Sequence, residues 1–357
     1  MKKGLYICIA FFYFTYVLGC KKDAQKQPTP PQKETHSLEK GLIHFSINGE
    51  LLGAAIDTVA NTITAVVPDT ANQHILTGSL ELQNQVTAKL NTTSVANNFT
   101  FDFTGPVTLT VTSENKQRST SFTVIIETQL QFEGFTGALI AQKSLNKSYD
   151  YYLDQFDGSE FASSNCGPAA STMAIKWADS TFNETPAHIR TLIEPQGGQW
   201  YTGDVQQYLK LNNIPYATDT LKNIDSLVKT NIGKNHVMIL CLNMLGVSPN
   251  SNNYQHVSRF YGNEVVGHFI LIKGYKQVGD TFYLEAYDPY SQNKHYPGYD
   301  YAQFMGKDRY YIDSQIETCV RGWWPYVIIV GPKGQHINSS PLKVSLQHKP
   351  LFQGKGQ

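Results

Sequence analysis

The chain has 357 residues, of which 41% are hydrophobic, and it carries 29 basic and 29 acidic side chains. A formal net charge of zero, without basic clusters interleaved with aromatic residues, argues against a protein that binds nucleic acid. The length and the hydrophobic content are sufficient for two domains with separate cores.

The N-terminus has the organisation of an export signal. Met1–Lys3 is basic, Gly4–Tyr16 is apolar but too short to span a bilayer stably, and a small residue then precedes Cys20. This pattern resembles a bacterial lipoprotein signal, which implies that Cys20 is lipidated and anchors the protein to the outer membrane of the cell envelope. Lys21–Asp23 is similar to the export signals of Bacteroidetes surface lipoproteins, so we expect surface exposure. An ordinary signal peptide that contains Cys20 is the alternative.

Removal of the signal leaves three cysteines for the folded part. Cys241 lies in an apolar run that predicts a buried strand, Cys319 lies between polar and aromatic segments, and Cys166 is discussed below. An oxidising compartment permits a disulfide between Cys241 and Cys319. A core thiol at Cys241 is the simpler interpretation.

Residues 21–40 are rich in Lys, Gln, Pro and Thr and predict a tether. From residue 41 to about 127, short β-branched runs alternate with turn pairs such as Asn48-Gly49 and Gly105-Pro106. Six or seven such strands predict an all-β immunoglobulin-like sandwich, similar to the small domains near the N-termini of Bacteroidetes surface lipoproteins. We interpret it as a spacer, and contact with a glycan or a protein is the alternative.

The second half begins with helices and continues with strands, which predicts an α+β domain. A linker with one or two strands is expected over residues 129–148. The later helices are expected over residues 185–190, 202–209 and 223–231, and the strands over residues 236–244, 267–276, 281–287 and 326–330.

A cysteine stands where a loop passes into the first of these helices. Ser164 or Asn165 can act as N-cap, Pro168 suits the first turn, and good helix formers follow. Cys166 is therefore expected at a helix N-terminus, where free N–H groups and the helix dipole stabilise a thiolate. This makes Cys166 a candidate nucleophile, with a buried structural cysteine as the alternative.

A cysteine nucleophile needs a base and a group that orients the base. His268 opens one apolar strand and Asp288 closes the next. With the connecting turn centred at Val278, the two residues would be direct cross-strand neighbours on one face of the sheet. A turn centred later would make them diagonal neighbours.

The order of cysteine, histidine and aspartate is that of papain-like cysteine peptidases. The segments Asn165–Ala170, Gly267–Phe269, Gly274-Tyr275 and Asp288-Pro289 resemble more closely the bacteriocin-leader, or double-glycine, peptidase family and its stand-alone relatives. The resemblance covers residues 150–332. It implies a papain-like fold and hydrolysis of peptide or protein substrates.

The resemblance also implies the role of each site residue. Cys166 would be the nucleophile, His268 the general base and acid, and Asp288 the orienting group. Gln155 is the nearest candidate for the glutamine that donates to the oxyanion, although its spacing of 11 residues is longer than that family leads us to expect. We expect no cofactor and no metal, because the histidines lack a pair at ligand-like spacing.

Together these observations predict a membrane-anchored thiol peptidase. A cysteine amidase or acyltransferase on the same scaffold, and a non-catalytic surface binding or adhesion lipoprotein, are the alternatives. The expected segments are a signal peptide over residues 1–19, a lipidated cysteine and tether over 20–40, an immunoglobulin-like sandwich over 41–128, a linker over 129–148, a papain-like peptidase domain over 149–333 and a disordered tail over 334–357.

Overall fold

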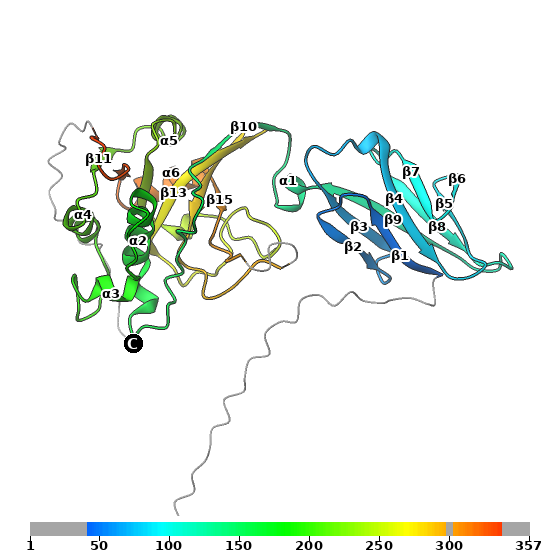
Figure 1. Cartoon of the computed structure of the whole chain (residues 1–357), viewed down its shortest axis with the longest axis horizontal. Helices are drawn as coiled ribbons and strands as arrows, with labels where there is room; N and C mark the ends of the chain where they lie inside the picture. Colours follow the sequence, from blue (N-terminus) through cyan, green and yellow to red (C-terminus); the bar gives the residue numbers. More distant parts are fainter. Residues whose placement is uncertain (1–40, 298–302, 338–357) are drawn as a thin grey trace, which may run out of the picture.

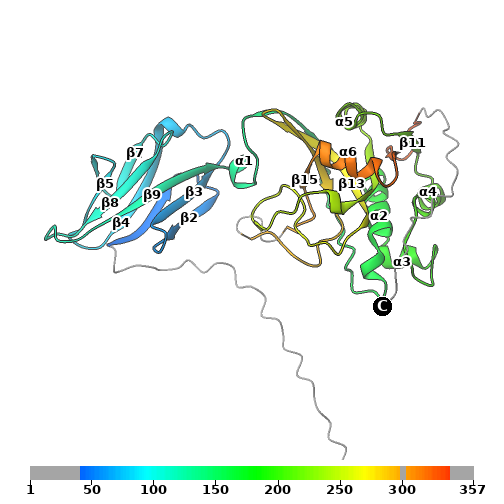
Figure 2. The ribbon, with the colours of Figure 1, turned by 180° about the vertical axis from the view of Figure 1, so that it is seen from behind.

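The computed structural model describes residues 41–297 and 303–337. The predicted signal peptide, Cys20, the tether and most of the predicted tail lie outside the described residues. The described part forms a β-sheet domain and a mixed α/β domain, joined through the short helix α1 (Gln129–Phe132) (Figures 1 and 2). No helix among the described residues is both long and apolar enough to cross a membrane.

The N-terminal domain consists of two sheets that share one hydrophobic core. One sheet has the order β1-β4-β7 and the other β2-β3-β9-β8-β5-β6, with β3 and β9 parallel. Alternating burial along β8 shows why these β-branched runs form strands with one face inward. Residues 41–128 thus hold nine strands rather than the six or seven expected, because short runs of three or four residues also pair. The strands are β1 (Leu42–Ile47), β2 (Leu52–Asp57), β3 (Thr62–Val67), β4 (Leu76–Leu82), β5 (Thr87–Leu90), β6 (Thr93–Val95), β7 (Asn98–Phe101), β8 (Val107–Thr112) and β9 (Ser119–Thr128).

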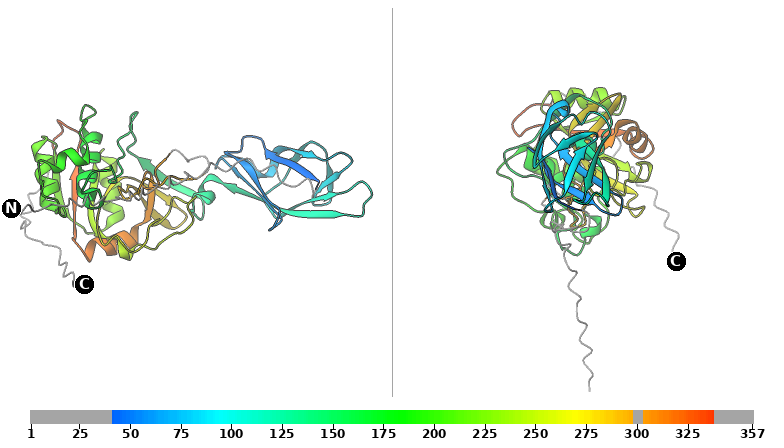
Figure 3. Two further views of the ribbon diagram at one scale, coloured as in Figure 1. Left: turned by 90° about the horizontal axis from the view of Figure 1, so that it is seen from below. Right: turned by 90° about the vertical axis from the view of Figure 1, so that its right-hand side faces the viewer.

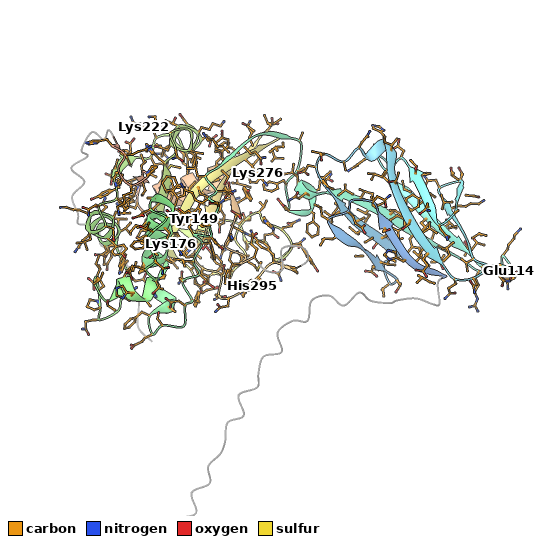
Figure 4. All side chains as sticks on the ribbon, in the orientation of Figure 1. Glu114, Tyr149, Lys176, Lys222, Lys276 and His295 are labelled. Carbon is orange, nitrogen blue, oxygen red and sulfur yellow. The ribbon has the colours of Figure 1, made fainter. Side chains whose placement is uncertain are left out.

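The segment expected to be a linker is largely ordered against the second domain. Its strand β10 (Leu139–Ser144) pairs antiparallel with β13 (Gly267–Val278) and so belongs to the second sheet. Helix α1 packs its Leu130 into a cluster with side chains of the second domain. Lys276, labelled in Figure 4, lies over the ring of Phe135 and reaches Glu133 at 3.3 Å. The connection therefore contacts the second domain both near its start, through α1 and Phe135, and near its end, through β10.

The second domain is built on an antiparallel sheet of seven strands. Its order is β11-β16-β12-β13-β14-β15, with β10 added beside β13. Helices α2 and α6 lie on opposite sides of this sheet (Figure 3). The remaining strands are β11 (Tyr216–Thr220), β12 (Val237–Asn243), β14 (Thr281–Tyr287), β15 (Arg309–Ile312) and β16 (Tyr326–Val330), and the helices are α2 (Cys166–Ala178), α3 (Pro186–Arg190), α4 (Thr202–Leu211), α5 (Ile224–Gly233) and α6 (Asp313–Arg321).

Among residues 41–297 and 303–337, the two cysteines outside the candidate site, Cys241 and Cys319, are buried and free. Cys241 lies in β12, as the apolar run predicts, and Cys319 lies in α6. The disulfide that the sequence left open is therefore absent. Helix α6 itself was not predicted, since it carries polar residues over most of its length.

A buried ion cluster ties β10, β13 and β14 together. The Nζ of Lys273 lies 2.5 Å from an oxygen of Glu285 and 2.6 Å from one of Asp308. It also donates to Ser144 Oγ at 3.0 Å and to Asn146 Oδ1 at 2.5 Å. We refer to these five residues as the Lys273 cluster. Register between β13 and β14 shifts at Lys273, between Ile272 and Gly274.

Candidate active site

Cys166 is the first residue of α2, directly after a short 3-10 turn over Ala162–Ser164. Its side chain is 8% exposed. Asn165 is the N-cap residue, as expected, but its side chain does not cap the helix. No side chain accepts from the first N–H groups, because Asn165 Oδ1 instead accepts a hydrogen bond from Arg190. The first N–H groups of α2 are thus left without a side-chain cap next to the thiol.

The helix start can lie this close to its neighbours because the residue after Cys166 is a glycine. A Cβ on Gly167 would lie 2.7 Å from the Cβ of Trp200. A second glycine precedes His268 in β13, and a Cβ on Gly267 would lie 2.7 Å from Cζ2 of Trp323. Cys166 and His268 each therefore have an adjacent glycine at a position where a tryptophan leaves no room for a side chain. Trp323 is half-buried and lies against Gly267, the residue before His268.

The imidazole of His268 is fixed by Asp288, although not in the expected register. His268 Nε2 lies 2.8 Å from Asp288 Oδ1, and both side chains are almost fully buried. The turn brings Val278 opposite Thr281, so its centre lies later than Val278, and the bulge at Lys273 shifts the register again. The two residues are therefore diagonal neighbours rather than a direct pair.

Two tyrosines complete the surroundings of Asp288. Tyr311 Oη donates to Asp288 Oδ2 at 2.5 Å and Tyr261 Oη at 2.9 Å. Oδ1 also accepts a hydrogen bond from the N–H of Tyr290 at 2.9 Å. Both carboxylate oxygens thus have two donors, which is a full set for a buried carboxylate. The sequence analysis missed both tyrosines.

Burial and charge act against each other in this pair. Burial alone would raise the pKa of Asp288, but the charge of His268 and the hydrogen bonds lower it below its ordinary value. Burial would lower the pKa of His268, but the attraction of Asp288 and the contact with Cys166 raise it to about 10. Since Nε2 faces Asp288, Nδ1 is the nitrogen left for Cys166. The arrangement favours a charged imidazolium beside the Asp288 carboxylate.

Gln155 lies close to the nucleophile but is engaged by the loop before it. Its side chain is 1% exposed, and Nε2 donates at 3.1 Å to the carbonyl oxygens of both Ala162 and Ser163. Its backbone N–H donates to the carbonyl of Pro289, the residue after Asp288. Gln155 thus links the loop before Cys166 to the residue after Asp288, and its role as oxyanion donor stays a prediction.

His256 and His295, the other histidines considered as metal ligands, both pack on aromatic rings. His256 stacks on the ring of Tyr296 at 3.9 Å, and His295 packs on Phe304 at 4.3 Å. Within residues 41–297 and 303–337, no group of three or more His, Cys, Asp and Glu side chains could hold a metal ion.

Two family models match separate parts of the chain. Residues 42–126 match the model described as "SGBP, N-terminal", and residues 145–316 match the Peptidase_C39 like family. The second match spans Cys166, His268, Asp288 and Gln155. It begins after β10, which the structure nevertheless places in the same sheet. No curated protein matches the chain in sequence.

Two solved structures have low similarity to the chain. A putative C39-like peptidase from Bacillus anthracis is 14% identical, with 53% of this chain and 97% of that chain covered and a TM-score of 0.34. A putative glycoside hydrolase from Bacteroides thetaiotaomicron is 11% identical, with 84% and 91% covered and a TM-score of 0.22. Such TM-scores do not establish a shared fold. The identification therefore rests on the family models: the chain joins a region similar to SGBP N-terminal domains to a region similar to C39-like peptidases.

Proposed function

We propose that the second domain is a thiol peptidase that hydrolyses peptide bonds through Cys166, His268 and Asp288. The observation that carries the proposal is the 2.8 Å contact between His268 Nε2 and Asp288 Oδ1, which leaves the opposite ring nitrogen for a cysteine at a helix start. A nucleophile, a base and a group that orients the base are the parts that such catalysis requires.

In the proposed reaction, His268 Nδ1 holds the proton of the Cys166 thiol, and the thiolate attacks the carbonyl carbon of the substrate. Free N–H groups at the start of α2 stabilise the resulting oxyanion, and Gln155 is a candidate to assist them. The imidazolium then gives its proton to the leaving amine. Water, activated by the same imidazole, hydrolyses the acyl-enzyme and regenerates the thiol.

Peptides or proteins are the proposed substrates. The same three residues would also act on another amide, such as a cell-wall peptide or glutamine. We further propose that lipid on Cys20 anchors the protein to the cell envelope with the peptidase domain exposed at the surface. The N-terminal β-domain would then act as a spacer.

A second candidate function is supported by the N-terminal match to the SGBP model. In that case the protein would be a non-catalytic surface protein that binds a glycan or a protein, and the peptidase-like domain would be inactive. The complete Cys166, His268 and Asp288 set favours catalysis, because a binding protein does not need a buried imidazolium beside a thiol.

The first experiment measures alkylation of Cys166 by iodoacetamide between pH 4 and 10 on residues 21–357, read by peptide mass spectrometry. Wild type is compared with His268→Ala and with a matched control, His256→Ala, which removes another buried imidazole. Rapid labelling well below pH 8, lost only in His268→Ala, supports the proposal. Labelling that follows an ordinary thiol, unchanged by His268→Ala, would refute it.

A second experiment separates the two candidate functions. Hydrolysis of labelled casein and of a mixed peptide library is measured for wild type and Cys166→Ala, and glycan-array binding is measured for both proteins. Turnover that Cys166→Ala abolishes supports the peptidase. Glycan binding that Cys166→Ala retains, without turnover in wild type, would favour the binding protein.

A further inference from the structure

A second cation, Arg190, lies behind the segment that carries the nucleophile. Arg190 ends α3, and its side chain is 3% exposed. Nε donates to Asn165 Oδ1 at 2.6 Å, Nη2 to the carbonyl of Ser164 at 2.9 Å and Nη1 to the carbonyl of Gly198 at 3.0 Å. Two of these three acceptors belong to the residues immediately before Cys166.

The pocket around the guanidinium is closely fitted. Its Cζ lies 5.7 Å from the centre of the Phe161 ring. On that same ring, a Cβ added to Gly197 would lie 2.4 Å from Cε1, so only glycine fits there. The planar fork of arginine, with donors in three directions, matches this set of acceptors, whereas a lysine would reach fewer of them.

None of these acceptors carries a charge. Among the described residues, no salt bridge within 4.0 Å includes Arg190, and its hydrogen bonds go to an amide, a hydroxyl and backbone carbonyls. The carboxylates of Glu194 and Asp204 act on it only at longer range, and Asp204 already accepts the N–H of Tyr201 at 2.7 Å. A buried cation without a counterion is costly, so a fold retains one where an anion forms nearby.

The hydrogen bonds of Arg190 and the charges near it point to Cys166 as that anion. Burial lowers the pKa of Arg190, and the charges of Cys166, Glu194 and Asp204 oppose this effect. Of these three groups, Cys166 directly follows the residues that accept hydrogen bonds from the guanidinium, Ser164 and Asn165. Cys241, which also faces Cys166, does not supply a negative charge, because burial raises the pKa of its thiol. His268 is the other cation beside Cys166, on the side of the sheet strands.

We propose that Arg190 is a positioning residue of the active site, which fixes Ser164 and Asn165 and supplies the positive charge that stabilises the Cys166 thiolate together with His268. The proposal rests on the proposed function, since it assigns a role in forming the nucleophile. The same charge would stabilise the oxyanion that develops beside the start of α2.

The test is the pH at which iodoacetamide labelling of Cys166 is half-maximal, measured on residues 21–357. Arg190→Gln removes the charge but can still donate, and Arg190→Lys retains the charge without the fork. Lys210→Gln is the matched control, because it removes an exposed positive charge from the adjacent helix α4. Thermal unfolding of every variant reports the purely structural effect.

We expect Arg190→Gln to move the labelling midpoint upward by about one pH unit, equivalent to about tenfold slower labelling at acidic pH. Arg190→Lys and Lys210→Gln should retain the midpoint of wild type. Asn165→Asp provides a second variant in case Arg190→Gln does not fold: it keeps the acceptor but neutralises the guanidinium, and it should also move the midpoint upward.

The alternatives give different results. If wild type shows an acid-shifted midpoint that neither Arg190→Gln nor Asn165→Asp changes, the role of Arg190 is refuted while the proposed function stands. Equal upward shifts in Arg190→Gln and Arg190→Lys would also refute the role of the charge. The shifts would then be explained by the lost hydrogen bonds to Ser164 and Asn165 alone. If Cys166 of wild type is labelled with the midpoint of an ordinary thiol, both proposals are refuted.

Discussion

The two tyrosines on Asp288 provide a quantitative test of the geometry. Tyr311→Phe removes the donor that lies 2.5 Å from Asp288 Oδ2 and leaves Tyr261 as the remaining donor to that oxygen. A hydrogen bond to a charged group contributes about 1.5–3 kcal/mol, and the site is fully buried, so we expect a loss of about 2 kcal/mol in the free energy of unfolding at pH 7. The assay is urea denaturation of wild type and variant.

The loss should depend on pH in a defined direction. The pKa of Asp288 is lowered in the folded protein, so the carboxylate stabilises the fold above the ordinary value of 3.8, and this contribution disappears as the pH falls through the folded pKa. The difference between Tyr311→Phe and wild type should therefore be largest above pH 5 and shrink toward pH 3.

Tyr310→Phe is the matched control for this prediction. Tyr310 precedes Tyr311 in β15 and is also buried, but its side chain lies on the other face of the strand, in the cluster with Leu130 and Phe135. Its substitution should cost less and should not depend on acidic pH. Equal losses for the two variants at every pH would refute the assignment of Tyr311 to Asp288.

Three further predictions concern the same domain. Because the pKa of His268 is raised to about 10, its contribution to stability is complete below about pH 6.5 and is lost as the pH rises toward 10. Urea denaturation should therefore show a free energy of unfolding that falls over this range in wild type and not in His268→Gln. Gly267→Ala should cost about 1–3 kcal/mol of stability through contact with the adjacent tryptophan, whereas Gly53→Ala, with nothing within 4 Å, should cost less than this in the same assay. Lys273→Met should be the most damaging of the three, with a loss of about 3–5 kcal/mol, since it leaves the buried carboxylate of Glu285 without its cation. A smaller loss in chemical denaturation would contradict this.

The sequence predicted those parts of the site that depend on local signals. Proline and small residues after Cys166 indicate a helix start, and α2 begins at that residue. The strands over residues 281–287 and 326–330 have the predicted bounds, because their apolar runs are bordered by clear turn residues. The contact between His268 and Asp288 was predicted because one residue lies at the start of a strand and the other directly follows the next strand of the hairpin.

Register was not predictable from the same signals. The prediction assumed an uninterrupted ladder, whereas the ladder contains a bulge at Lys273. That bulge places a lysine between a buried carboxylate from β14 and a half-buried one from the loop before β15, which the local sequence cannot indicate. A register argument holds only as far as the first irregularity in the ladder.

Tyr261 and Tyr311, which donate hydrogen bonds to Asp288, were not predicted for a related reason. Tyr261 lies in the long loop before β13, and Tyr311 lies in a strand that follows Asp288 by more than 20 residues. Nothing in their local sequence distinguishes them from other buried tyrosines, because their role depends on the distant carboxylate they contact. The order β13-β14-β15 in the sheet is the missing information, since it brings Tyr311 beside Asp288.

The distribution of buried charge favours catalysis over a purely structural role for this site. Asp288 is satisfied by donors on both oxygens, and the imidazole of His268 lies between it and the thiol of Cys166. On the far side of the nucleophile, Arg190 is buried with neutral acceptors alone. Two cations around one thiol are expensive to bury, and apolar residues of similar size would stabilise the fold better. A binding scaffold would gain nothing from retaining such an arrangement, which is therefore an argument for the proposed thiol peptidase.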